Sequence, residues 1–205
     1  MIGIIFATPW EAKPFLTKFN TEMIQERPFP LYSIDLPNTQ SPALVVISGI
    51  GKVPAALAAQ SLILGHNINT VVNVGICGAL AEDIEIGMLF RILKAMEGDR
   101  DADDNQAGPF YCSPELWPHL HQAKLVSNDK PVFDKLIKEK LAQWGDLVDM
   151  EGAAIARTAH LYGIKCALIK GVTDKADEEG KEILFKNIKK TSIMLANILW
   201  EGLTG

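Results

Sequence analysis

The stretch VDMEGAAIARTAHLYGIKCALIKGVTDKAD (residues 148–177) joins an amphipathic helix to an apolar strand. Ile155 and Ala159 recur at helical spacing, and Gly163 follows them as a helix terminator. The run KCALIKGV (165–172) is then almost continuously apolar, which is typical of a strand covered on both faces of a sheet. This stretch therefore predicts one helix–strand unit of an α/β fold.

The same two patterns alternate along the rest of the chain. A helix is predicted over 53–65, and a terminal amphipathic helix from about Glu182. Alternating strands and helices indicate an α/β domain with a largely parallel sheet, in which ligands gather at the carboxyl ends of strands. Short apolar, β-branched runs predict further strands at residues 2–6, 43–47, 70–76 and 88–95.

The composition is that of an ordinary globular protein. The chain has 205 residues, of which 48% are hydrophobic and 22% charged, and this predicts one domain over 1–205. The formal net charge is -5, so a surface that follows the phosphates of a nucleic acid is not expected. No apolar run reaches membrane-spanning length, and no cationic stretch precedes the first one. We therefore expect a cytoplasmic protein with neither membrane nor nucleic-acid partners.

The cysteines give no sign of a metal or disulfide site. Cys77, Cys112 and Cys166 match no zinc spacing, and an odd number of well-separated cysteines suits a reducing compartment. We predict no metal site. Residues 97–122 are rich in Asp, Pro and aromatic side chains without a sustained period. They predict a long ordered loop of the kind that forms lids, binding loops or partner contacts.

Two glycine-bearing segments fall short of the known phosphate-binding motifs. SGIGK (48–52) lacks the first glycine of a Walker loop, and Val53 stands where a Ser or Thr would hold magnesium. Pro54 occupies the third glycine position of a dinucleotide fingerprint. NVGICGAL (73–80) follows another strand, and we interpret Cys77 as a buried structural cysteine. Glycines in both segments permit close backbone approach, either to a ligand or within a tight turn.

Carboxylates are the informative side chains. Glu11 follows the first strand, and Asp149 and Glu151 lie on either side of Met150. Asp174 follows the strand that ends in GVTD. A parallel sheet would deliver these positions to one edge, where acidic groups suit acid and base chemistry on a neutral or cationic substrate.

Structural explanations stay open for the same carboxylates. Thr8 stands three residues before Glu11, which is the spacing of a capping box that closes a helix start. Pro14 weakens that interpretation, because it would lie in the second turn of such a helix. Glu151 and Asp174 could likewise be favourable charges near helix N-termini.

Four segments resemble a known family in their order and spacing. The family is the purine nucleoside phosphorylase and nucleosidase superfamily, and within it the methylthioadenosine/S-adenosylhomocysteine nucleosidases are the most similar. The resemblance implies a three-layer αβα sandwich, usually a homodimer, that cleaves the N-glycosidic bond of a small purine nucleoside without a cofactor. The matching segments are GIIFATPWEA (3–12), SGIGKVPAALAAQSLI (48–63), VVNVGICGALA (71–81) and the opening stretch 148–177.

The resemblance also implies roles for individual side chains. Glu11 falls on the acidic residue that holds and activates the attacking water, and Asp174 on the residue that protonates the purine at N7. Glu151 falls on the ligand of the ribose hydroxyls, with Met150 packed against the sugar. Asp174 would need to hold a proton, which requires burial to raise its pKa, whereas Glu11 would need to be ionised.

The remaining pocket positions include departures from the family. By resemblance, Ile50 lines the side of the 5′ substituent, and Thr173 supports the base-binding acid. Ile76 stands where related nucleosidases commonly carry a small polar residue. The family stacks the purine on an aromatic residue from the middle of the chain, and here that task falls to Phe133 or to the backbone near Val132.

The substrate and even the activity have alternatives. An acidic residue on the nucleophile side, with no arginine in a strand-end motif, favours water over phosphate as the nucleophile. Asp174 favours a 6-amino purine, because a carboxyl group can accept from the exocyclic amine while donating to N7. Futalosine hydrolase is the second candidate. A scaffold protein that binds a nucleoside without cleaving it is the alternative of another class.

Overall fold

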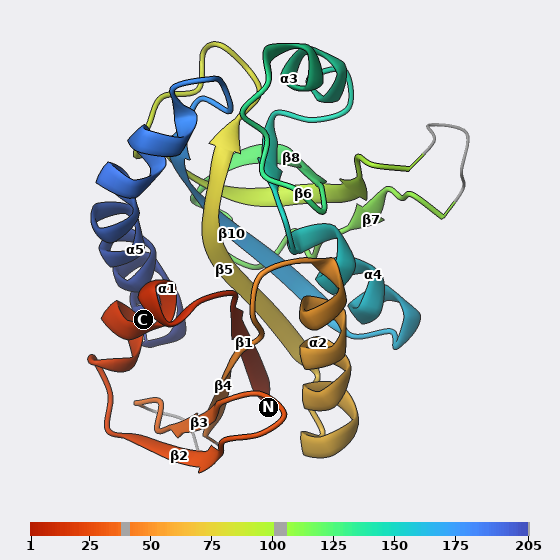
Figure 1. Cartoon of the computed structure of the whole chain (residues 1–205). Coiled ribbons are helices and arrows are strands. Elements are labelled where there is room, and N and C mark those ends of the chain that lie inside the picture. Colours follow the sequence, from red (N-terminus) through yellow and green to blue (C-terminus); the bar gives the residue numbers. More distant parts are fainter. Residues whose placement is uncertain (38–41, 101–105, 205) are drawn as a thin grey trace.

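The computed structural model describes residues 1–37, 42–100 and 106–204, which form a mixed α/β fold with one ten-stranded sheet (Figure 1). The strand order is β10-β6-β8-β9-β5-β1-β4-β3-β2, with β7 paired to β6 and a further pairing of β10 with β5. The strands are β1 (Ile2–Phe6), β2 (Thr21–Gln25), β3 (Leu31–Ile34), β4 (Ala43–Ile47), β5 (Thr70–Ala79), β6 (Leu89–Glu97), β7 (Phe110–Tyr111), β8 (His121–Ser127), β9 (Leu147–Asp149) and β10 (Lys165–Asp174).

The sheet is mixed, whereas the sequence predicted a largely parallel one. Strands β4, β1, β5 and β10 run parallel to their neighbours in that group. β3 pairs antiparallel with both β2 and β4, β9 with β5, and β6 with β10. The β2–β3 connection shows why: it spans only 26–30, which is too short for the crossover that a parallel pair needs.

Two pairs of helices cover the two faces of the sheet. In Figure 1, α2 and α4 lie on one side of the strands, and α1 and α5 on the other. Ala58 of α2 and Ala159 of α4 belong to one buried cluster, and their small side chains let these helices pack closely. Phe15 of α1 and Leu199 of α5 belong to a second cluster on the opposite face. The helices are α1 (Pro9–Leu16), α2 (Lys52–His66), α3 (Lys135–Leu141), α4 (Gly152–Leu161) and α5 (Gly180–Thr204).

The chain after β1 and the acidic segment before α4 differ from the sequence prediction. Pro14 was expected to disfavour a helix here, but α1 runs through it to Leu16. Proline at this position removes only the hydrogen bond to the Trp10 carbonyl, so a helix held at its start by a cap survives the loss. Asp149 ends β9, which is parallel to β8 as predicted but antiparallel to β5, and Glu151 lies beyond the strand at the start of α4.

The predicted loop over 97–122 holds short elements of structure. It contains β7, and β8 begins at His121. Residues 101–105 of that loop lie outside the described residues. Across the parts of the chain that the structure describes, no helix combines the length and the apolar character needed to cross a bilayer.

Candidate active site

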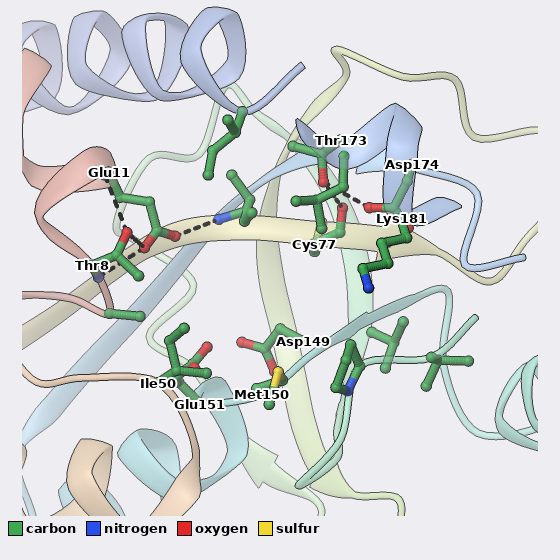
Figure 2. A pocket seen from close by; sticks show the side chains of 18 of the residues that line it. Thr8, Glu11, Ile50, Cys77, Asp149, Met150, Glu151, Thr173, Asp174 and Lys181 are labelled. Atoms are coloured by element: carbon green, nitrogen blue, oxygen red, sulfur yellow. Dashed lines mark hydrogen bonds between the residues drawn. The ribbon is translucent and has the colours of Figure 1, made fainter. Parts of the chain in front are cut away.

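A cavity of about 430 Å³ lies where β1, β5, β9 and β10 meet the start of α5. Figure 2 shows its side chains: Glu11 and Thr8 lie at one end, Thr173 and Asp174 at the other, and Glu151 beside Met150 and Ile50. All nine residues that the sequence nominated line this one cavity. They are Glu11, Ile50, Ile76, Val132, Phe133, Met150, Glu151, Thr173 and Asp174.

Glu11 is fixed by hydrogen bonds on both carboxylate oxygens. Oε2 accepts from the backbone N–H of Thr8 at 2.9 Å and from its hydroxyl at 2.7 Å, which completes a capping box. Oε1 accepts from the backbone N–H of Ile76 at 3.1 Å. A carboxylate offers about four lone-pair positions, so one remains on Oε1. Burial raises the pKa of Glu11, although these hydrogen bonds and the charge of Lys170 oppose the rise.

Glycines on β5 make room for the acidic groups. A Cβ at Gly75 would lie 2.9 Å from Glu11 Oε1 and 3.4 Å from Lys170 Nζ. A Cβ at Gly78 would lie 3.0 Å from Asp174 Oδ2. The close backbone approach predicted for NVGICGAL therefore serves the side chains of the cavity, since a larger residue would displace a carboxylate.

Asp174 is buried at the other end, where β10 ends. Its Oδ1 lies 2.8 Å from the hydroxyl of Thr173, and its Oδ2 accepts from the backbone N–H of Ala176 at 3.0 Å. Thr173 is itself anchored, because its hydroxyl lies 3.2 Å from the carbonyl of Cys77. Burial raises the pKa of Asp174 and the negative charge of Asp177 adds to the rise, while the two hydrogen bonds oppose it. The side chain is therefore biased toward its protonated form.

Glu151 connects the β4–α2 loop to the start of α4. Its Oε1 accepts from the backbone N–H of Gly51 at 2.8 Å, which also places Ile50 at the cavity wall. Gly51 adopts a φ of 106°, a conformation that favours glycine. Burial, and then the negative charge of Asp149, raise the pKa of Glu151 to about 7, and the charge of Lys170 acts in the opposite direction.

Sequence reasoning missed the cation beneath these acids. Lys170 of β10 forms an ion pair of 2.7 Å with Asp149, and both side chains are 1% exposed. Burial alone would lower the pKa of Lys170, but the charges of Asp149 and Glu151 outweigh it and raise the pKa. Lys170, in the middle of the apolar run KCALIKGV, was the available signal, because a charge inside a strand covered on both faces needs a buried partner.

Lys170→Met should lower the free energy of unfolding by about 3–5 kcal/mol, because the substitution leaves the Asp149 carboxylate buried without its partner. Urea denaturation at neutral pH measures the change. Lys165→Met, on the same strand, is the matched control: its ion pair with Glu115 is 61% and 49% exposed. Lys165→Met should lower the free energy of unfolding by about 0–1 kcal/mol. Equal losses of unfolding free energy in the two variants would show that the buried ion pair stabilises the protein no more than the exposed one.

The electrostatics of the cavity give its two ends different tasks. Near Glu11, Glu151 and Asp149, three carboxyl groups lie around the cation of Lys170. Above a pH of about 7, where Glu151 is ionised, these groups would stabilise positive charge that develops there. Near Asp174, a carboxyl group with a raised pKa can donate a proton. Such a pair of environments, one holding charge and one holding a proton, suits cleavage of a bond whose two fragments develop opposite charges.

Comparisons with known proteins agree with this geometry. The family model described as "Phosphorylase superfamily" matches residues 1–200. Aminodeoxyfutalosine nucleosidase of Helicobacter pylori is 26% identical over 182 residues, covering 76% of this chain and 77% of that protein. The 5′-methylthioadenosine/S-adenosylhomocysteine nucleosidase of Maridesulfovibrio salexigens is 27% identical over 164 residues, covering 68% and 71%. A crystal structure of a Helicobacter pylori MTAN mutant with 5′-methylthioadenosine in its active site has a TM-score of 0.89 at 25% identity, covering 98% of this chain and 96% of that one.

Proposed function

Because the chain belongs to the phosphorylase superfamily, we propose that it hydrolyses the N-glycosidic bond of a purine nucleoside of the methylthioadenosine/S-adenosylhomocysteine type and releases the free base. One observation carries the proposal. Glu11, Glu151 and Asp174 come from distant parts of the chain and line the same cavity. The named relatives are nucleosidases, which agrees with this activity. The proposed reaction needs no cofactor.

Asp174 acts on the leaving base. Cleavage of a purine–ribose bond places negative charge on the base, and protonation at N7 relieves it. Burial raises the pKa of Asp174, which favours the protonated form that this step requires, and Thr173 holds the carboxyl group in a fixed orientation. Val132 and Phe133 line the same end of the cavity and would pack on the base.

Glu11 and Glu151 act on the sugar and on water. The ribose hydroxyls would bind Glu151 with Met150 packed against the sugar. Above its pKa of about 7 the Glu151 carboxylate is ionised and stabilises the cation that develops at C1′. Glu11 accepts a proton from the attacking water through the lone pair that remains on Oε1. Its raised pKa makes it a stronger base than an exposed glutamate.

Water is favoured over phosphate as the nucleophile. A phosphorylase must hold a phosphate dianion, which normally requires arginines and several backbone donors. Among the described residues that line the cavity there is no arginine, and Glu11 would repel a dianion at the nucleophile side. Related nucleosidases commonly carry a small polar residue at the position of Ile76, and here Ile76 contacts Glu11 through its backbone N–H.

Futalosine-type nucleosides form the second candidate substrate class. The similarity to the aminodeoxyfutalosine nucleosidase favours this class about as strongly as the methylthioadenosine class. Both candidates place a purine beside Asp174, and they carry different substituents at the 5′ end of the sugar. A carboxyl group at the base can serve a 6-amino purine by accepting from the amine and donating to N7.

Incubation with methylthioadenosine, adenosine, inosine and futalosine, each with and without phosphate, tests the proposal. Chromatography of the released base is the measurement. Release of free base without phosphate from at least one nucleoside is the expected result. Strict dependence on phosphate would indicate a phosphorylase instead, and release from none of the four would leave a nucleoside-binding scaffold.

The architecture supports the remaining expectations for the family. One sheet contains all ten strands of the described residues, which agrees with a single domain over 1–205. The helix pairs on its two faces agree with a three-layer αβα sandwich. α2 also carries a row of exposed apolar side chains, Val53, Leu57 and Leu64, beside the exposed Leu161 of α4. A second copy of the chain in a homodimer would cover this face.

Leu57→Glu should therefore convert a dimer into a monomer, because it places a charge in the middle of the apolar face. Sedimentation equilibrium should give twice the 22.5 kDa of one chain for the unchanged protein and one chain mass for the variant. Leu136→Glu is the control, since Leu136 is 76% exposed on α3 and lies outside this face. A single-chain mass for the unchanged protein would contradict the homodimer.

A further inference from the structure

A single cation lines the cavity wall, at the end that holds Asp174. Among the described residues of that wall, Lys181 is the only lysine or arginine. Figure 2 shows its side chain beside Asp174, with the amine directed into the cavity. Lys170 is buried beneath the other carboxylates in its ion pair with Asp149 and is 1% exposed. A ligand at the Asp174 end would therefore meet the amine of Lys181.

The backbone at the start of α5 fixes where the Lys181 side chain begins. α5 starts at Gly180, whose N–H donates to the carbonyl of Asp177 at 2.9 Å. A Cβ at Gly180 would lie 3.0 Å from the ring of Phe133 and 3.2 Å from Asp174 Oδ2. The first residue of the helix thus lies directly against both side chains. Lys181 follows it, so its side chain leaves the helix at this end of the cavity.

The amine of Lys181 is not used by the protein itself. The side chain is exposed, and no hydrogen bond or ion pair joins it to another residue in the described parts of the chain. Even Asp177, whose buried Oδ1 has no hydrogen-bond partner, does not bind this amine. An ammonium group offers three donors and no acceptor. All three donors are available to a ligand.

The purine edge that faces Asp174 determines what such a donor can bind. With N7 at Asp174, the substituent at position 6 lies on the same edge of the base. A 6-aminopurine carries donors there, which an ammonium group cannot bind, whereas a 6-oxopurine carries the acceptor O6 beside the acceptor N7. The protonated carboxyl group of Asp174 has one hydrogen and can donate to only one of these two acceptors. A 6-oxopurine therefore needs a second donor at this end of the cavity.

We propose that Lys181 is a specificity-determining residue whose amine donates a hydrogen bond to O6 of a 6-oxopurine, so that the cavity accepts 6-oxopurine nucleosides as well as 6-amino ones. This inference rests on the proposed nucleosidase function and widens its substrate class. Hydrogen bonds from charged donors are stronger than those from neutral ones. Loss of the donor would leave O6 unpaired inside the cavity, which weakens binding of the 6-oxo base alone.

Isothermal titration calorimetry with hypoxanthine and adenine tests this hydrogen bond without requiring turnover. Lys181→Met keeps the apolar stem of the side chain and should raise the Kd of hypoxanthine about 10- to 100-fold, while the Kd of adenine should change less than about threefold. Lys181→Arg retains a charged donor and should restore most of the affinity for hypoxanthine. Lys190→Met is the matched control, because Lys190 is exposed on α5 and does not line the cavity.

Turnover should show the same preference. 5′-Methylthioinosine and 5′-methylthioadenosine share the sugar and its 5′ substituent and differ in the purine. The ratio of kcat/KM for the inosine compound to that for the adenosine compound should fall about 10- to 100-fold in Lys181→Met. Lys190→Met should leave this ratio unchanged.

The outcomes separate this inference from the proposed function. Unchanged hypoxanthine affinity in Lys181→Met, or a loss of equal size with adenine, would overturn the role of Lys181 and leave the nucleosidase intact. Failure of the unchanged protein to bind hypoxanthine would overturn it too. Hypoxanthine binding that depends on Lys181, in a protein that cleaves no nucleoside, would establish the contact with the base and refute the proposed function.

Discussion

Asp174→Asn should lower kcat for methylthioadenosine by about 100- to 10,000-fold, which is the usual contribution of a positioned general acid. Asparagine has nearly the same size and can still accept a hydrogen bond from the Ala176 N–H, which lies 3.0 Å from Oδ2. It has no proton to transfer to N7. Release of adenine, followed by its absorbance change, measures the loss, and circular dichroism with urea denaturation checks that the fold is retained.

A substrate with a good leaving group isolates the proton transfer. A 4-nitrophenyl β-riboside releases a stable phenolate that needs no protonation, so general acid catalysis contributes little to its cleavage. The penalty of Asp174→Asn should therefore shrink at least tenfold with this riboside. A penalty of equal size with both substrates would mean that Asp174 holds the substrate in place without acting as an acid.

The pH dependence of kcat/KM tests the same role of Asp174, and the direction in which it should shift can be predicted. The charge of Asp177 adds to the burial that raises the pKa of Asp174. Asp177→Asn removes that charge and lowers this pKa, so the acid form is lost at a lower pH and the alkaline limb of kcat/KM should move down. An alkaline limb that does not move would assign it to another group.

Stability should change with pH in the matching direction. A carboxyl group whose pKa is raised by folding stabilises the protein below its unfolded pKa, and this contribution is lost as the pH rises through the folded pKa. Asp174→Asn removes the part of this pH dependence that comes from Asp174, since asparagine does not titrate. The variant should therefore unfold at the same or a higher urea concentration than the unchanged protein at pH 8.

The sequence was most informative where a strand is covered on both faces. β1 and β10 were predicted because their residues are almost all apolar, and helices do pack on both sides of the sheet. Short or polar strands escaped prediction. β9 has only three residues, and β2 is exposed along nearly its whole length, so neither carries a periodic pattern.

The sequence predicted which residues line the cavity but not how their charges interact. A family resemblance places Glu11, Glu151 and Asp174 at the cavity one residue at a time. The pairing of Lys170 with Asp149 depends on how β9 and β10 are placed around β5, which no local pattern encodes. The pKa shifts likewise follow from burial, which arises only when distant segments pack together.

Glu11→Gln should lower kcat by about 100- to 10,000-fold, because the amide cannot accept the proton of the attacking water. The accompanying change in the free energy of unfolding should be smaller than the loss of transition-state stabilisation. Glutamine also serves in a capping box, so the amide oxygen can keep both hydrogen bonds from Thr8. The backbone N–H of Ile76 would then face the amide nitrogen, and the lost hydrogen bond costs about 1–3 kcal/mol. Neutralising a buried carboxylate offsets part of that cost.

Thr8→Ala distinguishes a catalytic role of Glu11 from a capping role. It removes the side chain that closes the first turn of α1 and retains the Glu11 carboxylate, so it should lower the free energy of unfolding by about 1 kcal/mol. Its loss of kcat should be at least tenfold smaller than that of Glu11→Gln. If Glu11 were only a cap, this difference would disappear: Thr8→Ala would impair the enzyme as much as Glu11→Gln, and activity would follow stability in both variants. Steady-state kinetics and urea denaturation on the same preparations therefore determine whether the carboxylate takes part in the reaction or only holds the helix.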